Sequence, residues 1–513
     1  MTSALVFVLC FFCAASCGTK STDALEYELT DGKNEYAVIG ISDPTVTEIY
    51  IPEKHDGLPV TEIKETAFYG NAAIEKAEMS DNIKKIGERA FYKCNNLKSV
   101  KLPDGLQELE DETFAYCHKL TDIKIPSGLL HIKNGVFKSC ITLTQINIPS
   151  TVREIGDDAF YECQLSSVII PNHVNAIGNR AFAHTRIENL TLGGNLYTIG
   201  DCAFFQCCFL TDLTIPDNVT HIGNQAFSGC INLENISLGK KVLHIGNDAF
   251  SGCKNLGGIV FPDDVETIGS GAFHNCENLS FASFRGQKIT LIEAYTFSGC
   301  KIGTIEIPYS VEDIGQNAFD GCPCVKETDG LSYVDKWLLK CDETLSTAEI
   351  KADTVGIANN AFLKCYSLTE ITLPENVKNI GRSAFLQCCG LKEIKVHPYN
   401  KNLKSVNGNL FNSNLTVLIY CITGMNNAET AFTVPDTVTE IREFAFDNCP
   451  YLTTINISEN VKKFGDALFY GCGALTDINY NGTENQWEKI EKGTLWEPKG
   501  CTVHCTDADI RII

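Results

Sequence analysis

One phenylalanine recurs along this 513-residue chain at nearly constant spacing, and this repeat limits the available folds more than any other feature. Most steps between successive members are 22 to 24 residues. A unit so short cannot cover its own apolar side and has to stack on copies of itself, so the period predicts a solenoid. The members are Phe68, Phe91, Phe114, Phe137, Phe160, Phe182, Phe204, Phe227, Phe250, Phe273, Phe297, Phe319, Phe362, Phe385, Phe446 and Phe469.

Apolar and special residues fall at fixed places within each unit. Leu213 and Ile215 are two residues apart, which sends both side chains to one face of a short strand. Pro216 follows, and because proline has no N–H for a strand ladder, the strand is expected to end there. The segment ending in Ile222 is expected to turn the chain inward, and Gly223 permits a tight backbone. An Ala-Phe pair then fills the core from the far side.

The residue between the two strand apolar residues points the other way, so successive coils should align a column of outward side chains. This column is rich in hydroxyl and amide groups and lacks aromatic rings, so it offers no stacking ladder for sugars. We interpret it as a candidate binding face, the concave column, for a protein or an extended peptide. The alternative is a solvated sheet face that binds nothing in particular. Its selected members are Lys101, Lys124, Asn147, Thr191, Thr214, Ser237, Glu306 and Thr372.

The chain has 25 cysteines, and 14 of them fall three residues after a repeat phenylalanine. Parallel side chains about 4.8 Å apart keep their Cβ atoms too distant for a disulfide, which wants roughly 3.8 Å. We therefore interpret this column as buried thiols that fill the core. Its first nine members are Cys94, Cys117, Cys140, Cys163, Cys207, Cys230, Cys253, Cys276 and Cys300.

Charge and motif content narrow the function classes. The formal net charge of -22 argues against binding to nucleic acid or to an anionic membrane surface, which would require clustered Lys and Arg. Acidic residues such as Asp157 and Asp158 occupy repeat loops, where solvation is the expected reason. The ten histidines are scattered, and no nucleophile motif, phosphate loop or dinucleotide fingerprint is present. We predict no enzyme activity and no cofactor.

The best metal candidate is Cys501-x-x-His504-Cys505 near the C-terminus. Two thiols and an imidazole are suitable zinc ligands, but no fourth ligand is apparent. A terminal disulfide and ordinary packing are the alternatives, and we assign no metal site.

The pattern IGxxAFxxCxxLxxIxIPxxV occurs across most of the chain, for example from Ile155 to Cys163 and from Ile222 to Cys230. It resembles the BspA-type leucine-rich repeat family of bacterial and some protozoan surface proteins. The resemblance implies an α/β repeat fold: a leucine-rich repeat solenoid with a curved parallel β-sheet, short helical or irregular convex segments and terminal caps. It also implies protein–protein binding, in adhesion to host matrix or cell-surface proteins or to neighbouring cells. A structural envelope scaffold, or a ligand-capture lipoprotein without an adhesive role, is the alternative.

The N-terminus carries an apolar run over residues 4–16, too short to span a bilayer and typical of a secretory signal. Ala14-Ala15-Ser16-Cys17 looks like a lipoprotein cleavage box, which would make Cys17 the site of lipid attachment. A plainly cleaved signal and an unrelated apolar end are the alternatives. The expectation is a secreted, cell-surface protein, anchored by lipid to the outer side of a bacterial membrane and contacting the membrane only through that anchor.

Breaks in the period set the expected organisation within one elongated domain. Phe319 and Phe362 are 43 residues apart, and Phe385 and Phe446 are 61 apart. The two insertions are candidate recognition elements or merely tolerated additions. The predicted segments are a lipoprotein-type signal peptide (1–17), an N-terminal β cap (18–62), repeats (63–322), a degenerate repeat or insertion (323–356), repeats (357–478) with a hairpin-bearing variant coil (397–432), and a C-terminal cap (479–513).

Overall fold

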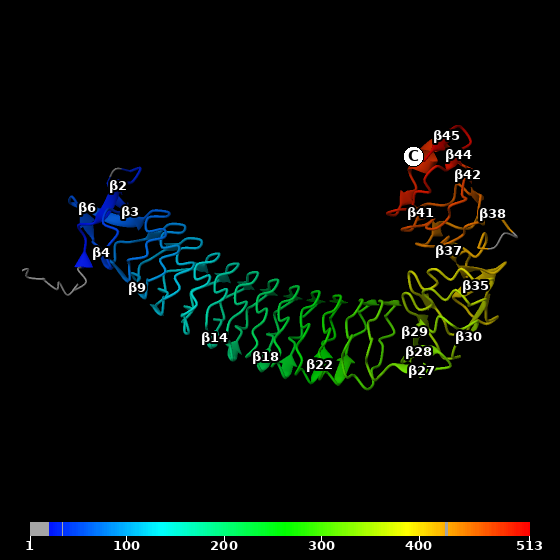
Figure 1. Ribbon diagram of the computed structural model, residues 1–513, viewed down its shortest axis with the longest axis horizontal. Coiled ribbons are helices and arrows are strands. Elements are labelled where there is room, and N and C mark those ends of the chain that lie inside the picture. Colours follow the sequence, from blue (N-terminus) through cyan, green and yellow to red (C-terminus); the bar gives the residue numbers. More distant parts are fainter. Residues whose placement is uncertain (1–19, 33, 426–428, 513) are drawn as a thin grey trace, which may run out of the picture. The chain divides into compact units, whose positions relative to one another are not determined.

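The computed structural model describes residues 20–32, 34–425 and 429–512, which divide into two compact units. The first ends at Leu196 and also takes in Gln206–Cys208; the second contains Tyr197–Phe205 and continues from Phe209. The chain forms a parallel β-solenoid of about 20 turns with almost no helix, which confirms the predicted fold class (Figure 1). The division falls inside the predicted repeats 63–322. The predicted signal peptide 1–17 and Cys17 lie outside the described residues.

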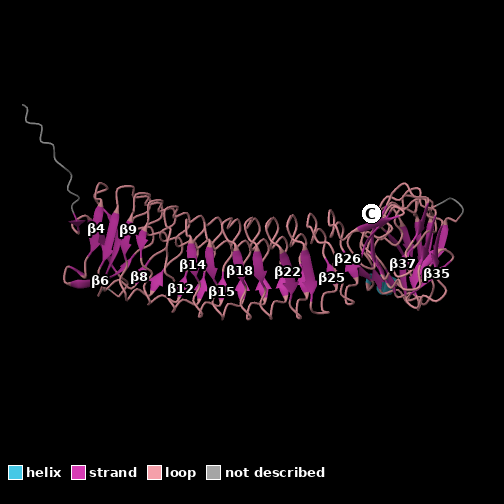
Figure 2. Ribbon diagram, turned by 90° about the horizontal axis from the view of Figure 1, so that it is seen from below, coloured by secondary structure: helices cyan, strands magenta, loops and turns pink. Residues whose placement is uncertain are grey.

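Most coils contribute two short strands, whereas the sequence pattern predicted one. The first strand holds the Ile-x-Ile segment, and we call the sheet of these strands the strand face. The second strand ends in the isoleucine before the repeat glycine, and we call its sheet the second sheet. Ile222, predicted to lie in an inward turn, is therefore part of a strand. Turns connect the strands in every coil (Figure 2).

In the first unit both sheets are mainly parallel. The strand face contains β1 (Lys20–Ser21), β4 (Glu48–Ile51), β7 (Lys76–Met79), β9 (Ser99–Lys101) and β11 (Asp122–Ile123), then β14 (Ser167–Ile169) and β16 (Asn189–Thr191). The second sheet contains β2 (Leu25–Leu29), β3 (Tyr36–Ile41), β6 (Leu58–Ile63) with β5 (Lys54–His55), β8 (Lys85–Ile86) and β10 (Glu108–Leu109), then β12 (His131–Ile132), β13 (Glu154–Ile155) and β15 (Ala176–Ile177). β2 and β3 pair antiparallel at the N-terminal end.

The second unit repeats this arrangement. Its strand face contains β18 (Asp212–Thr214), β20 (Asn235–Ser237), β22 (Gly258–Phe261), β24 (Phe281–Phe284), β30 (Thr347–Glu349), β32 (Glu370–Leu373), β34 (Glu393–Val396), β38 (Ala431–Thr433), β40 (Thr454–Ile457), β42 (Asp477–Tyr480), β44 (Thr502–His504) and β45 (Asp509–Arg511). The second-sheet strands are β17 (Thr198–Ile199), β19 (His221–Ile222), β21 (His244–Ile245), β23 (Thr267–Ile268), β25 (Leu291–Ile292), β26 (Asp313–Ile314), β31 (Gly356–Ile357), β33 (Asn379–Ile380), β39 (Glu440–Ile441), β41 (Lys463–Phe464) and β43 (Glu491–Lys492).

The repeat phenylalanines form the centre of the core. The ring of Phe227 stacks on Phe204 at a centroid distance of 5.1 Å and on Phe250 at 5.4 Å. All three side chains are fully buried. Parallel register places identical residues of neighbouring coils above one another, as with Ile222 opposite Ile245, so each apolar side chain is covered by its own equivalent.

The glycine after the repeat isoleucine allows the backbones of neighbouring coils to lie close together. A Cβ atom at Gly223 would lie 2.5 Å from the carbonyl carbon of Gly200 and 2.6 Å from the backbone nitrogen of Asp201. The left-handed backbone conformation falls instead on Gln225 (φ 54°) and Gly229 (φ 76°), the residues that shape the turn around the Ala-Phe pair. A side chain at Gly223 is therefore excluded by the neighbouring coil.

Both irregular coils of the second unit contain a β-hairpin. β27 (Lys326–Thr328), β28 (Leu331–Val334) and β29 (Trp337–Cys341) pair antiparallel, and β29 then joins β31 in parallel. β35 (Leu403–Val406), β36 (Asn409–Asn412) and β37 (Val417–Tyr420) repeat this design, and β37 joins β39. The sequence pattern predicted the second hairpin but only a degenerate coil for the first. The overlooked signal was Asp329-Gly330, whose positive φ angles of 52° and 76° suit a tight hairpin turn.

The C-terminal end holds one helix, α1 (Glu484–Glu488). It begins at Glu484, because Thr483 caps it and forms a capping box with Gln486. The buried ring of Trp487 packs against Trp496 at a centroid distance of 5.9 Å. The antiparallel pair β44–β45 follows.

Candidate functional site

The strand face presents the predicted column to solvent. All eight selected residues are exposed. Thr214 lies opposite Ser237 in the parallel pair β18–β20, one coil apart. Two lysines of the column are paired, Lys101 with Glu78 at 3.0 Å and Lys124 with Asp104 at 3.7 Å. Binding by this column, and its position on a concave surface, stay predictions.

The nine selected cysteines lie in the core and are at most 1% exposed. Each thiol donates to a phenylalanine carbonyl of the preceding coil, as Cys117 does to Phe91 at 3.2 Å and Cys253 to Phe227 at 3.3 Å. Burial raises the pKa of Cys140 and of Cys253 to about 12. The column therefore closes hydrogen bonds between coils and is poorly suited to nucleophilic chemistry.

We expect iodoacetamide to modify the native protein selectively. At pH 8 a thiol with a pKa of about 12 is ionised in about one molecule in ten thousand, so Cys140 and Cys253 should stay unmodified, whereas exposed Cys389 should react. Peptide mass mapping after brief labelling measures this directly, and labelling in urea is the control that every site can react. Equal labelling of Cys389 and Cys253 in the native protein would contradict the prediction.

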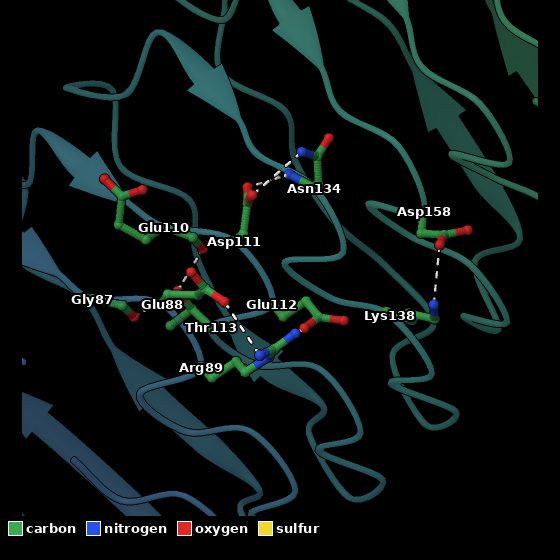
Figure 3. Close-up of polar contacts among 10 residues, drawn as sticks. All are labelled: Gly87, Glu88, Arg89, Glu110, Asp111, Glu112, Thr113, Asn134, Lys138 and Asp158. Atoms are coloured by element: carbon green, nitrogen blue, oxygen red, sulfur yellow. Dashed lines mark hydrogen bonds and ion pairs between the residues drawn. The ribbon is translucent and has the colours of Figure 1, made fainter. Parts of the chain in front are cut away.

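Acidic residues at the turns bond the first unit's coils together instead of being merely solvated. Asp111 accepts a hydrogen bond from the backbone N–H of Asn134 at 2.9 Å, and Asn134 in turn accepts from Asp157 at 2.9 Å (Figure 3 shows the first of these). Asp158 pairs with Lys138 at 3.0 Å, also drawn in Figure 3, and with Arg180 at 2.7 Å. This Asn/Asp ladder corrects the expectation of solvated loop carboxylates, because it satisfies backbone donors between coils.

A row of tyrosines in the first unit was missed by sequence reasoning, which examined only the strand column for aromatics. Tyr69 stacks on Tyr92 at 5.1 Å, and Tyr92 meets Tyr116 edge-on at 5.3 Å. The ammonium of Lys93 lies 5.3 Å from the centroid of Tyr92 and 6.0 Å from that of Tyr116. The signal was an aromatic residue one or two places after the repeat phenylalanine.

The two irregular coils border hollows in the second unit. Beside the second hairpin, a groove of about 710 Å³ is lined by strand-face residues and by the hairpin turn at Asn407 and Gly408. Lys395 in its wall is paired with Glu370 at 2.7 Å. Beside the first hairpin, a hollow of about 260 Å³ is bordered by Tyr309 and Trp337. Both insertions are thus associated with concave surface.

A further hollow, which we call the convergence pocket, lies on the second sheet and has a volume of about 370 Å³. Its charged lining comes from three separate parts of the second unit: Glu312 and Asp313, Lys378 and Arg382, and Arg442. In a regular solenoid each coil contacts only its neighbours. This pocket brings together coils that are about three turns apart in sequence.

Hydrogen bonds between coils that are far apart in the sequence hold the convergence pocket together. Asn379 donates to the carbonyl of Val311 at 3.0 Å, and Arg442 donates to the carbonyl of Ile380 at 3.0 Å. Lys378 donates to the carbonyl of Tyr309 at 3.2 Å and lines both this pocket and the hollow of the first hairpin. The hairpin coils therefore allow distant turns to approach one another.

Asp313 is the unusual member of the convergence pocket. Its Oδ1 atom is buried and has no hydrogen-bond partner among the described residues. Burial raises the pKa of the Asp313 carboxyl to about 6, against the opposing effects of the Ile314 backbone N–H, Arg442 and Arg382. A half-buried carboxyl with a raised pKa, next to cations and in a hollow, is a typical mark of a ligand site.

The C-terminal residues considered for zinc are arranged differently. His504 bonds Asp477 through Nε2 at 2.9 Å and Asp509 through Nδ1 at 2.8 Å, and these contacts raise its pKa. Cys501 is buried. Among the described residues, no group of three or more histidine, cysteine or acidic side chains is placed to hold a metal ion.

Fold and exposed strand column together define a leucine-rich repeat protein. The family model described as BspA type leucine rich repeat region matches residues 61–188, 175–300, 290–418 and 420–497. The chain therefore belongs to the BspA-type leucine-rich repeat family. No curated protein sequence matches it significantly. Within the described part of the chain, helices long and apolar enough to cross a bilayer are absent.

Several solved structures similar to this chain are bacterial leucine-rich repeat proteins. One from Bacteroides ovatus is 20% identical, covers 94% of this chain and 98% of its own, and has a TM-score of 0.45. A leucine-rich cell surface protein from Faecalibacterium prausnitzii is also 20% identical, with coverages of 92% and 97% and a TM-score of 0.32. A third, from Eubacterium ventriosum, is 20% identical, with coverages of 61% and 96% and a TM-score of 0.38.

Proposed function

We propose that this chain is a cell-surface binding protein that adheres to host or neighbouring cells by holding proteins on its strand face. The observation that carries the proposal is that, within each unit, parallel strands hold exposed side chains of the column in register, as with Thr214 opposite Ser237. A rigid sheet with outward side chains at fixed spacing suits recognition of an extended protein segment, since little order is lost on binding. Membership in a repeat family associated with protein–protein interaction supports the same conclusion.

Display at the surface is part of the proposal. It is supported by the predicted signal over residues 1–17 and by the cell-surface description of the Faecalibacterium prausnitzii protein. We propose lipid attachment at Cys17 as the anchor. Labelling intact cells with a membrane-impermeant reagent, with and without a Cys17→Ser substitution, tests both points. Loss of the protein from the cell fraction in the variant is the expected result.

Substitution of the column tests binding. We expect a variant with Thr191→Asp and Thr214→Asp to lose most of the partners that the unmodified ectodomain captures by crosslinking, because buried interface positions tolerate unpaired charge poorly. The control is Asn175→Asp with Thr267→Asp, which adds the same two charges next to or within the second sheet. Capture against host matrix and against envelope extracts distinguishes adhesion from an envelope scaffold. Equal capture by both double variants would refute the role of the column.

A further inference from the structure

The convergence pocket combines two features that point to one ligand chemistry. Lys378, Arg382 and Arg442 bring three positive charges to its lining, against the two carboxylates Glu312 and Asp313. The whole chain has a formal charge of -22, so three cationic side chains around one hollow are unusual. Positive side chains that converge on a small hollow favour an anionic group.

The two arginines of the pocket differ in the hydrogen bonds and ion pairs that their guanidinium groups already make within the protein. Arg442 donates to the Ile380 carbonyl and lies 3.4 Å from a carboxylate oxygen of Glu443. The guanidinium of Arg382, in contrast, makes no hydrogen bond or ion pair with any other described residue and is exposed. It can therefore offer a planar pair of N–H donors to a carboxylate.

Asp313, in contrast to the arginines, needs a hydrogen-bond donor from the ligand. Its unpartnered Oδ1 is a buried acceptor, and leaving such an atom without a donor is unfavourable. An anion alone would not satisfy it, because two negative groups would then face each other. A ligand that carries both a carboxylate and a nearby N–H would satisfy Arg382 and Asp313 together.

We propose that the convergence pocket binds a carboxylate whose adjacent carbon carries an N–H group, as found in a free α-amino acid and at the C-terminus of a peptide. The carboxylate contacts Arg382 and Lys378, and the N–H donates to Asp313. The volume of about 370 Å³ falls at the lower end of the range for small-ligand pockets and suits a ligand of this size. The site is on the second sheet, so it is independent of the strand-face column.

The protonation of Asp313 gives the site a pH dependence. Its pKa of about 6 arises from burial, opposed by the Ile314 backbone N–H, Arg442 and Arg382, while Glu312 and Lys378 also line the pocket. Below pH 6 the carboxyl gains a proton, loses its negative charge and becomes a weaker acceptor for an N–H donor. Affinity for the N–H-bearing ligand is therefore expected to fall as the pH drops from 7 to 5.

Isothermal titration of the full chain tests the proposal with defined probes: N-acetylglycylglycine as the free acid, the same compound as its C-terminal amide, glycine, acetate and inorganic phosphate. We expect the free acid to bind at least about tenfold more tightly than the amide or acetate. Glycine binding more tightly than the acetylated acid identifies a free amino acid as the source, and the reverse identifies a peptide terminus. Equal binding of acid and amide, no binding of the free acid, its amide or glycine, or tightest binding of phosphate would overturn the proposal.

Two substitutions assign the contacts. Arg382→Gln should weaken binding of the free acid at least about tenfold, whereas the matched Arg285→Gln, at an exposed arginine outside the pocket, should leave it unchanged. Asp313→Asn should weaken the preference for the acetylated acid over acetate while retaining acetate binding, because a neutral amide oxygen is a poorer acceptor than a carboxylate. Thermal unfolding of each variant shows whether it is folded. Equal losses of affinity for the free acid in Arg382→Gln and Arg285→Gln would overturn the proposal. An unchanged preference for the acetylated acid in Asp313→Asn would also overturn it.

Discussion

Replacing Phe227 by alanine is expected to lower the free energy of unfolding by about 3–5 kcal/mol, the usual cost of truncating a buried phenylalanine. The ring is fully buried and stacks nearly parallel on Phe204 and Phe250, at interplanar angles of 4° and 2°. Alanine would leave a cavity between two rings that have no other way to cover those faces. The neighbours cannot close the gap, because Gly223 already contacts the preceding coil through its backbone.

Urea unfolding followed by fluorescence or circular dichroism measures the loss, and hydrogen exchange with mass spectrometry locates it. Since a solenoid coil contacts mainly its neighbours, faster exchange should appear over residues 198–250 and leave residues 454–480 unchanged. Phe281→Ala is the control, because Phe281 is 51% exposed. Similar destabilisation by the two substitutions would show that the stacked column is not the main stabilising feature.

The second large effect has the opposite sign. Asp313→Asn is expected to stabilise the protein by roughly 2–3 kcal/mol at pH 8, since one pKa unit corresponds to about 1.4 kcal/mol. The folded pKa of about 6 exceeds the ordinary 3.8, so the folded state disfavours the ionised carboxyl. The stability contributed by this group is fully present below pH 3.8 and is lost as the pH rises through 6.

The difference between Asp313→Asn and the unmodified protein should therefore shrink towards zero as the pH falls from 8 to 4. Denaturant unfolding at pH 4, 6 and 8 measures this trend. Asp263→Asn, at an exposed carboxyl outside the pocket, is the control and should change stability little at each pH. A pH-independent difference would mean that Asp313 is not the titrating group.

A carboxyl that costs stability at neutral pH fits the ligand proposed for the convergence pocket. Groups retained against stability are commonly those that serve binding or catalysis. Asp313→Asn is expected both to stabilise the chain and to weaken the ligand preference. Finding one effect without the other would separate the folding cost of Asp313 from its proposed role.

Sequence periodicity determined the solenoid, the strand face and the position of the core residues. Phe227 and Cys230 could be placed without coordinates, because one period sets which side chains stack on their equivalents. The second sheet was missed, since two-residue strands such as β19 leave almost no alternation to detect. The role of Asp157 was also missed, because its hydrogen-bond partner Asn179 lies one coil away.

The convergence pocket left a trace in the sequence that only the structure could explain. Arg382 stands where Asn224 and Asn247 form the turn ladder in other coils, and Arg442 stands at the place of the repeat glycine. These departures mark unusual coils, but they do not say that Asp313 lies beside them. A repeat fixes contacts between neighbouring coils, whereas the approach of coils separated by hairpin insertions depends on the three-dimensional path that those insertions impose.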